Sequence, residues 1–255
     1  MKKRFILLTV LTASVSFFIG SCNKKDDFRS DAMTDYVRTA TGSFIRYKLD
    51  SLRFTEFGQG EITVSYDAKD VVDGPLDILG PNSYRIIRYY RPWGSTNDGD
   101  WIPQISYSVT VSTDQVKVLE DNLTYVKLKL PIKEGVTWLG NSFLPVHPLA
   151  PRYQFSNDGD MRDWEYAYEN VGETTTLGTV NYENTITIQH VADSQNAPVT
   201  DPNLIGYRNY SSEVYAKGVG LVFKDFRMWE YQPKNGDKPA FKTGFGIQLT
   251  AIGHN

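Results

Sequence analysis

Apolar and polar side chains alternate with a period of two along much of the chain. From Ile105 to Ser112 every odd position is apolar and every even position carries a hydroxyl group. The same period occurs in four further segments, at 62–66, 126–130, 186–188 and 241–251. Because successive side chains of a β-strand point to opposite faces of the sheet, this pattern predicts strands with one buried and one wet face.

Short polar segments separate the predicted strands. Asp73-Gly74-Pro75, Gly80-Pro81-Asn82 and Asn235-Gly236-Asp237 contain the residues that tight turns require. Only the segment 31–39 has a helical pattern, and it is long enough for one or two turns. We therefore expect an all-β fold: a single large curved antiparallel sheet of about ten strands, half-barrel or sandwich-like, with little helix. Residues 36–255 are expected to form one β-domain.

The first 22 residues have the pattern of an export signal. Met1 to Arg4 is basic, the 15 residues from Phe5 to Ile19 carry no charge, and Gly20-Ser21-Cys22 follows. A membrane-spanning helix needs roughly 20 apolar residues, so this segment is too short for a permanent anchor. We expect residues 1–21 to be a signal peptide.

Ile19-Gly20-Ser21-Cys22 resembles the lipobox of bacterial lipoproteins. The resemblance implies cleavage between Ser21 and Cys22 and attachment of acyl chains such as palmitate to Cys22. The alternative is an ordinary secretory signal with an incidental cysteine. Cys22 is the only cysteine of the chain, so it has no partner for an intramolecular disulfide. Residues 22–35 are then a charged tether.

Four further segments resemble outer-membrane lipoproteins of the Bacteroidota, one of them only in part. Asn23 to Asp27 resembles their signal for surface export, although a generic charged tether is the alternative. Trp138-Leu139-Gly140-Asn141 resembles their "WxGN" turn, and 213–224 resembles their "YAKGVGLVYK" hairpin. The segment 35–51 is a partial match to their N-terminal pattern. The resemblance implies a lipid-anchored β-domain in the outer membrane, exposed at the cell surface, and it carries no assigned activity.

Gly218 and Gly220 of the hairpin are expected to adopt positive φ or to form a bulge between the inward-pointing Tyr215 and Leu221.

Charge excludes one class of partner. Removal of the signal leaves 24 basic and 30 acidic residues, a net charge of −6. No cluster of Lys and Arg follows residue 29, so the basic surface of a nucleic-acid-binding protein is missing. The expected partners are the membrane, through the N-terminal lipid, and an apolar or glycan ligand or a protein of the envelope.

Candidate binding residues are few, and no catalytic motif occurs. The three histidines stand singly, and neither a zinc motif nor a nucleophile elbow is present. His190, Asp193 and Ser194 lie close in sequence, but a chain of this length offers such combinations by chance. No cofactor and no catalytic residue are expected.

Tryptophans and aspartates in predicted loops supply the remaining candidates. The tryptophans are candidates for stacking on a ligand. The alternative is that they fill the ends of the curved sheet as buried side chains. Two loops with the sequence Asn-Asp-Gly-Asp carry acids that suit calcium, although they also suit tight turns. The candidate ligand-binding residues are Trp93, Trp101, Trp164 and Trp229, and the weak calcium candidates are Asp98, Asp100, Asp158 and Asp160.

The sequence favours a lipid-anchored, non-catalytic module that binds an apolar or saccharide ligand. The alternative is an interaction subunit of an outer-membrane assembly. A hydrolase is the weaker alternative.

Overall fold

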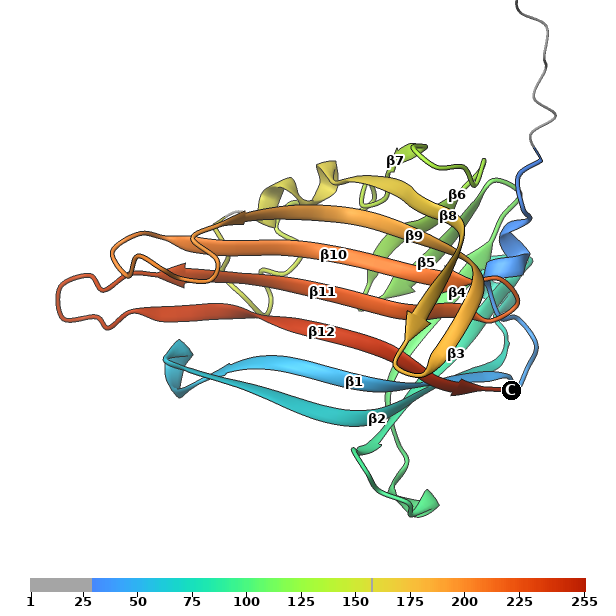
Figure 1. The fold of residues 1–255 in the computed structure, drawn as a ribbon, viewed down its shortest axis with the longest axis horizontal. Helices are drawn as coiled ribbons and strands as arrows, with labels where there is room; N and C mark the ends of the chain where they lie inside the picture. Colours follow the sequence, from blue (N-terminus) through green and yellow to red (C-terminus); the bar gives the residue numbers. More distant parts are fainter. Residues whose placement is uncertain (1–28, 157) are drawn as a thin grey trace, which may run out of the picture.

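Twelve strands form one antiparallel sheet in the computed structural model, which describes residues 29–156 and 158–255 (Figure 1). The predicted all-β, curved antiparallel fold with little helix is confirmed. The strand number is twelve where about ten were expected, in part because a three-residue strand at Thr137–Leu139 is too short to show a period of two. The helical elements are 3-10 turns.

Consecutive strands pair as hairpins from β1 to β6 and again from β7 to β12, whereas β6 and β7 do not pair. Their bounds are η1 Met33–Tyr36, β1 Phe44–Thr55, η2 Glu56–Gly58, β2 Gly60–Pro75, η3 Asp77–Leu79, β3 Ser83–Pro92, η4 Asp98–Asp100, β4 Ile102–Val111, β5 Gln115–Glu120, β6 Leu123–Lys129, β7 Thr137–Leu139, η5 Asp158–Asp163, β8 Glu165–Leu177, β9 Val180–Gln195, β10 Gly206–Ala216, β11 Gly220–Gln232 and β12 Phe241–His254. The spatial order is β6-β5-β4-β3-β2-β1-β12-β11-β10-β9-β8-β7. Strand β12, the last in the chain, thus pairs with β1, the first.

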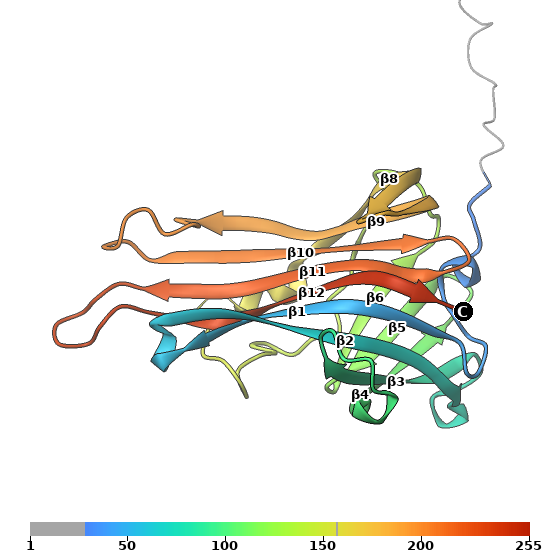
Figure 2. The ribbon, with the colours of Figure 1, turned by 60° about the horizontal axis from the view of Figure 1, so that its bottom comes forward.

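The sheet curls into a nearly closed barrel (Figure 2), and its two edge strands, β6 and β7, come close to each other (Figure 1). At this seam the Val126 amide of β6 donates to the carbonyl of Gly140, just after β7, at 2.8 Å. The indole N–H of Trp138 donates to the Val126 carbonyl, also at 2.8 Å. The hydroxyl of Tyr168 accepts from the Lys129 amide at 2.9 Å and donates to its carbonyl at 2.8 Å. These contacts satisfy part of the edge of β6, whose backbone groups would otherwise lack partners.

The Trp138-Leu139-Gly140-Asn141 segment has a structural reason for its residue types. A Cβ on Gly140 would lie 2.3 Å from the ring of Tyr166, so only glycine fits. The Asn141 amide donates to the Met161 carbonyl at 2.8 Å and accepts from the Tyr166 hydroxyl at 2.6 Å. This turn therefore fixes the segment that covers the seam.

The β10–β11 hairpin has the glycine geometry expected from the sequence. Gly218 and Gly220 have φ of +76° and +106°, and Tyr215 and Leu221 both line the barrel interior. The Gly218 amide donates to the Asp35 carbonyl at 2.6 Å, which joins the hairpin to η1.

Element η1 packs against one end of the barrel, near the C-terminus (Figure 1). Its Met33 and Tyr36 are 4% and 1% exposed. Asp31, just before it, accepts from the Lys217 ammonium at 2.6 Å. The last residues of the expected tether 22–35 thus contact the β-domain, while 22–28 and the predicted signal peptide lie outside the described residues. The β9–β10 and β11–β12 hairpins project at the opposite end.

Candidate functional site

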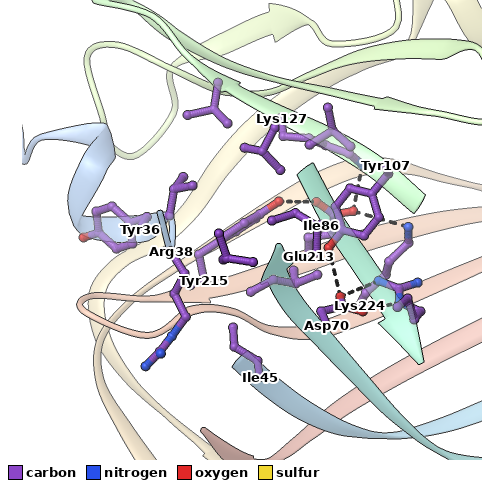
Figure 3. Close-up of a pocket in the computed structure, with 18 of the residues that line it drawn as sticks. Tyr36, Arg38, Ile45, Asp70, Ile86, Tyr107, Lys127, Glu213, Tyr215 and Lys224 are labelled. Carbon is purple, nitrogen blue, oxygen red and sulfur yellow. Dashed lines mark hydrogen bonds and ion pairs between the residues drawn. The ribbon is translucent and has the colours of Figure 1, made fainter. Parts of the chain in front are cut away.

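Charged side chains surround the middle of the barrel interior. Six strands each contribute one inward-pointing charge there, and three are acidic and three basic. We refer to them as the charged belt: Asp70 of β2, Arg88 of β3, Glu120 of β5, Lys127 of β6, Glu213 of β10 and Lys224 of β11. Figure 3 labels Asp70, Lys127, Glu213 and Lys224. Charges taken out of water need partners, so the belt's contacts decide what the interior can bind.

Arg88 and Asp70 form a closed pair on neighbouring strands. The guanidinium donates to both carboxylate oxygens, at 2.5 and 2.7 Å, and both side chains are 7% exposed. The Tyr107 hydroxyl adds a third bond to Asp70, at 2.9 Å. Burial opposes the charge of Arg88, but the adjacent carboxylate outweighs it and raises the pKa of Arg88. This part of the belt is fully paired.

Glu213 accepts two hydrogen bonds inside the barrel. Its Oε1 lies 2.7 Å from the Lys127 ammonium, and its Oε2 accepts from the Tyr215 hydroxyl at 2.7 Å. Burial disfavours the ionised form of Glu213. The Lys127 charge, and to a smaller extent the Lys224 charge, outweigh burial and lower the pKa of Glu213. Burial lowers the pKa of Lys127. The Glu213 carboxylate is therefore held as an anion in the middle of the protein.

Glu120 and Lys224 are the loosely held members of the belt. The Lys224 ammonium lies 3.8 Å from Glu213 Oε1, which is beyond hydrogen-bond distance. Burial disfavours the Glu120 anion, whereas the Lys224 and Arg88 charges outweigh it and lower the pKa of Glu120. Unlike the other belt residues, these two line three adjoining cavities.

The belt separates the interior into cavities of different size. A cavity of about 110 Å³ lies on the side of η1 and is lined mainly by valine, isoleucine and tyrosine (Figure 3). A second, of about 520 Å³, lies toward the β1–β2 turn and the start of β12. A third, of about 50 Å³, lies against His190 and Tyr166. The cavity of about 520 Å³ is large enough for a small organic molecule, and we call it the main cavity.

Stacked aromatic rings form one wall of the main cavity. Phe245 stacks on Tyr153, with centroids 5.1 Å apart, and on Phe226 at 5.3 Å. Tyr153 also stacks on Phe155 at 5.5 Å, and Phe226 contacts Trp164 at 6.5 Å. Tyr153 and Phe245 each stack on two other rings, whereas Phe226 stacks on Phe245 and meets Trp164 at a tilt of 39°. Much of the stacking surface of these rings is therefore engaged within the wall. We call Tyr153, Phe226 and Phe245 the aromatic wall.

Two arginines lie toward the mouth of the main cavity. Arg152, which is largely exposed, lies 3.1 Å from Asp121. Arg53 of β1 pairs in register with Phe245 of β12. Its guanidinium donates to the hydroxyls of Tyr66, at 2.9 Å, and Ser51, at 3.2 Å. The mouth is thus polar and the wall behind it apolar.

His190 is buried in the third cavity, away from the residues beside it in the sequence. Its ring stacks on Tyr166 at 3.8 Å, and its Nδ1 lies 2.7 Å from Ser211 Oγ. Its Nε2 lies 3.8 Å from Glu213 Oε2 and makes no hydrogen bond to the described residues. Burial, then the Lys127 charge, lower the pKa of His190 well below its ordinary value. The histidine is therefore neutral, and a cavity of about 50 Å³ has room for water but not for a substrate. Asp193 accepts from the Tyr207 hydroxyl instead, at 3.3 Å.

The four candidate tryptophans do not form one site. Trp164, 7% exposed, lines the smallest of the three cavities. Trp229 is also 7% exposed, with the Lys242 ammonium 4.8 Å from its ring centroid. Trp93 is 46% exposed, and Lys69 and Arg91 each lie 4.4 Å from the ring of Trp101. Three of the four therefore lie apart from the cavities described above.

The four aspartates of the Asn-Asp-Gly-Asp loops lie in two separate turns, η4 and η5. Asp100 accepts from Ser95 at 2.5 Å and from the side chain of Asn97 at 2.8 Å, and the Asp98 side chain is 95% exposed. Asp158 is buried, with its Oδ1 2.5 Å from His147 Nδ1. Burial, then neighbouring acids, raise the pKa of Asp160. In residues 29–156 and 158–255, no three His, Cys, Asp or Glu side chains gather in a metal-binding group.

The belt and the aromatic wall were not among the residues predicted from the sequence. A weak signal exists, because Lys127 stands between Val126 and Leu128 within a predicted strand. The interpretation of 213–224 was confined to folding, yet the structure places its Glu213, Tyr215 and Lys224 in or beside the belt. Cys22 and Ser21, the predicted lipidation and cleavage residues, lie outside the described residues.

No family model, curated protein or solved structure matches this chain. Within the part of the chain that the structure describes, no helix has the length and apolar character needed to cross a membrane.

Proposed function

We propose that this chain is a lipid-anchored protein of the cell envelope that binds a small, largely apolar molecule in its main cavity. The observation that carries the proposal is a cavity of about 520 Å³ beside an aromatic wall. Ligand sites of small molecules commonly have volumes of roughly 300 to 1,000 Å³, mostly apolar linings and few polar groups. Attachment at Cys22 rests on the lipobox pattern alone.

The aromatic wall favours an apolar ligand over a saccharide. A sugar ring stacks on the open face of an aromatic side chain, and such faces must be free to accept it. In the wall, Phe245 and Tyr153 each already stack on two other rings. An apolar chain or ring needs only contact with ring edges and with residues such as Leu52, Ile105 and Ile247, which also line the cavity.

Catalysis is not part of the proposal. The Ser211–His190–Glu213 cluster combines residue types that nucleophilic catalysis uses, but its side chains are at most 2% exposed. A nucleophile needs its substrate within about 3 to 3.5 Å, and the cavity of about 50 Å³ beside His190 has no room for one. We assign this cluster to the stability of the barrel.

A titration of the full chain with N-phenyl-1-naphthylamine, a neutral fluorescent probe of apolar sites, tests the proposal. The expected result is saturable binding of one probe per chain, with a blue shift of probe emission. A linear, non-saturating rise of emission up to the solubility of the probe would contradict a defined apolar site.

A further inference from the structure

Arg53 is an oriented cation at the mouth of the main cavity. It follows Ser51 and Leu52 along β1, which also line this cavity. The guanidinium bonds to two hydroxyl groups, and its carbon lies 5.6 Å from the ring centroid of Tyr66. Among the described residues no carboxylate pairs with Arg53. Arginine has five N–H donors, and these two hydroxyls leave the others open.

The charges around the main cavity leave one positive charge in excess. The lining contains four cations, Arg53, Arg88, Arg152 and Lys224, and two acids, Glu120 and Asp121. Asp70, which does not itself line this cavity, neutralises Arg88, and Asp121 pairs with Arg152. Lys224 is the largest charge that favours the Glu120 anion, so these two offset each other. Arg53 remains, which means that one negative charge on a ligand would balance the cavity.

We propose that the ligand is an amphiphile with a single carboxylate, bound by Arg53 at the mouth, and an apolar chain that lies along the aromatic wall. This inference rests on the proposed function. The planar fork of an arginine matches the geometry of a carboxylate and binds it with two parallel hydrogen bonds. Arg53 is the cross-strand neighbour of Phe245. A ligand whose carboxylate is bound by Arg53 therefore has the first carbons of its apolar chain next to the aromatic wall.

The floor of the main cavity, which is the inner end that Glu120 and Lys224 line, does not suit the ligand's carboxylate. Lys224 is the available cation there, but Glu120 lines the same floor and Glu213 Oε1 lies 3.8 Å from the ammonium. Burial makes the repulsion between like charges stronger than at the surface. A carboxylate at Lys224 would thus meet two anions, whereas one at Arg53 meets two hydroxyl groups.

Two probes with the same chain and different heads test this assignment: decanoate and 1-decanol. Equilibrium dialysis of the full chain at pH 7.5 should give about tenfold tighter binding of decanoate, the value of one charge-assisted contact. The variant Arg53→Gln should bind decanoate no better than 1-decanol and should leave the affinity for 1-decanol within about twofold. Arg53→Lys, which keeps the charge, should retain part of the preference. Arg85→Gln, at an exposed arginine outside the main cavity, is the control and should retain all of it.

The outcomes separate the two proposals. Equal affinities of the unaltered chain for decanoate and 1-decanol would overturn the assignment of an acidic ligand and leave the apolar site supported. Loss of the preference in Lys224→Met but not in Arg53→Gln would place the acid on the floor and overturn the role of Arg53. Absence of saturable binding for both probes would overturn the proposed function and this inference with it. Circular dichroism of each variant confirms that the barrel is folded.

Discussion

The ammonium of Lys127 lies 2.7 Å from Oε1 of Glu213, across the barrel interior and 86 residues away in sequence. Strands β6 and β10 are not neighbours in the sheet, so this ion pair joins two walls of the barrel. Both side chains are almost inaccessible, at 10% and 2% exposure. The pair therefore fixes how the curled sheet closes, and it sets the polarity of the space that a ligand would enter.

Loss of one partner of this pair should destabilise the protein strongly. In Lys127→Met the Glu213 carboxylate would remain buried without its closest cation, and such a change costs about 3 to 5 kcal/mol. The double variant Lys127→Met with Glu213→Gln should recover part of this loss, because no charge is then left unpaired. Urea unfolding measures both. Lys48→Met, in the partly exposed pair with Asp50, is the control and should change the free energy of unfolding by less than about 1 kcal/mol. Equal effects of the two lysine variants would contradict the burial argument.

His190 should make the stability of the protein pH-dependent below neutrality. Burial, then the Lys127 charge, hold the pKa of His190 well below 6.5, so the folded protein keeps it neutral while the unfolded chain takes up a proton. The unfolded state then binds more protons, and stability falls as the pH drops below about 6.5, by up to about 1.4 kcal/mol per pH unit. His190→Asn, which cannot titrate, should flatten the dependence between about pH 6.5 and 5 in urea-unfolding midpoints. An unchanged slope in this variant would assign the pH dependence to other groups.

Gly140 should tolerate no side chain. A Cβ there would lie 2.3 Å from the ring of Tyr166, which is buried and bonded to Asn141. Gly140→Ala should therefore lower the free energy of unfolding by about 1 to 3 kcal/mol through overpacking. Gly253→Ala is the matched control, because a Cβ at Gly253 meets nothing within 4 Å. Thermal unfolding of the two variants makes the comparison, and similar midpoints would contradict the close packing of the seam.

Cys22 should determine where the protein resides. Cys22→Ala removes the residue that the lipobox pattern assigns to acylation, so the signal peptide should stay uncut and acyl labelling should disappear. Cell fractionation with labelled palmitate measures both. Normal processing and membrane attachment of the variant would refute the lipoprotein prediction.

The fold followed from local patterns, whereas the interior charges did not. The alternation in 105–112 predicted a strand with Tyr107, Val109 and Val111 on one face, and these three residues line or pack in the interior. A period of two is visible in any short window, so the all-β class was accessible. The closure of the sheet is not visible in such a window, because it depends on contacts between the two sheet edges, such as that of Trp138 with Val126.

Lys127 shows why the belt was missed. The alternation in 126–130 predicted that Val126 and Leu128 face the core, and both are indeed buried. However, β5 and β6 shift register there: Val116 pairs with Leu128 and Lys117 with Val126, so Lys127 has no partner on β5. The alternation of faces is broken at this irregularity, and the Lys127 side chain reaches an acid 86 residues away. No local pattern reports a partner at that distance.

A pair of neighbouring substitutions on β4 tests the central claim, an apolar ligand site inside the barrel. Ile105 lines the main cavity, whereas the next residue, Ser106, is exposed on the outer face. Ile105→Trp should fill the cavity and weaken binding of N-phenyl-1-naphthylamine at least about tenfold, while Ser106→Trp should leave its affinity within about twofold. Equal probe affinities of the two folded variants would contradict a binding site in the main cavity.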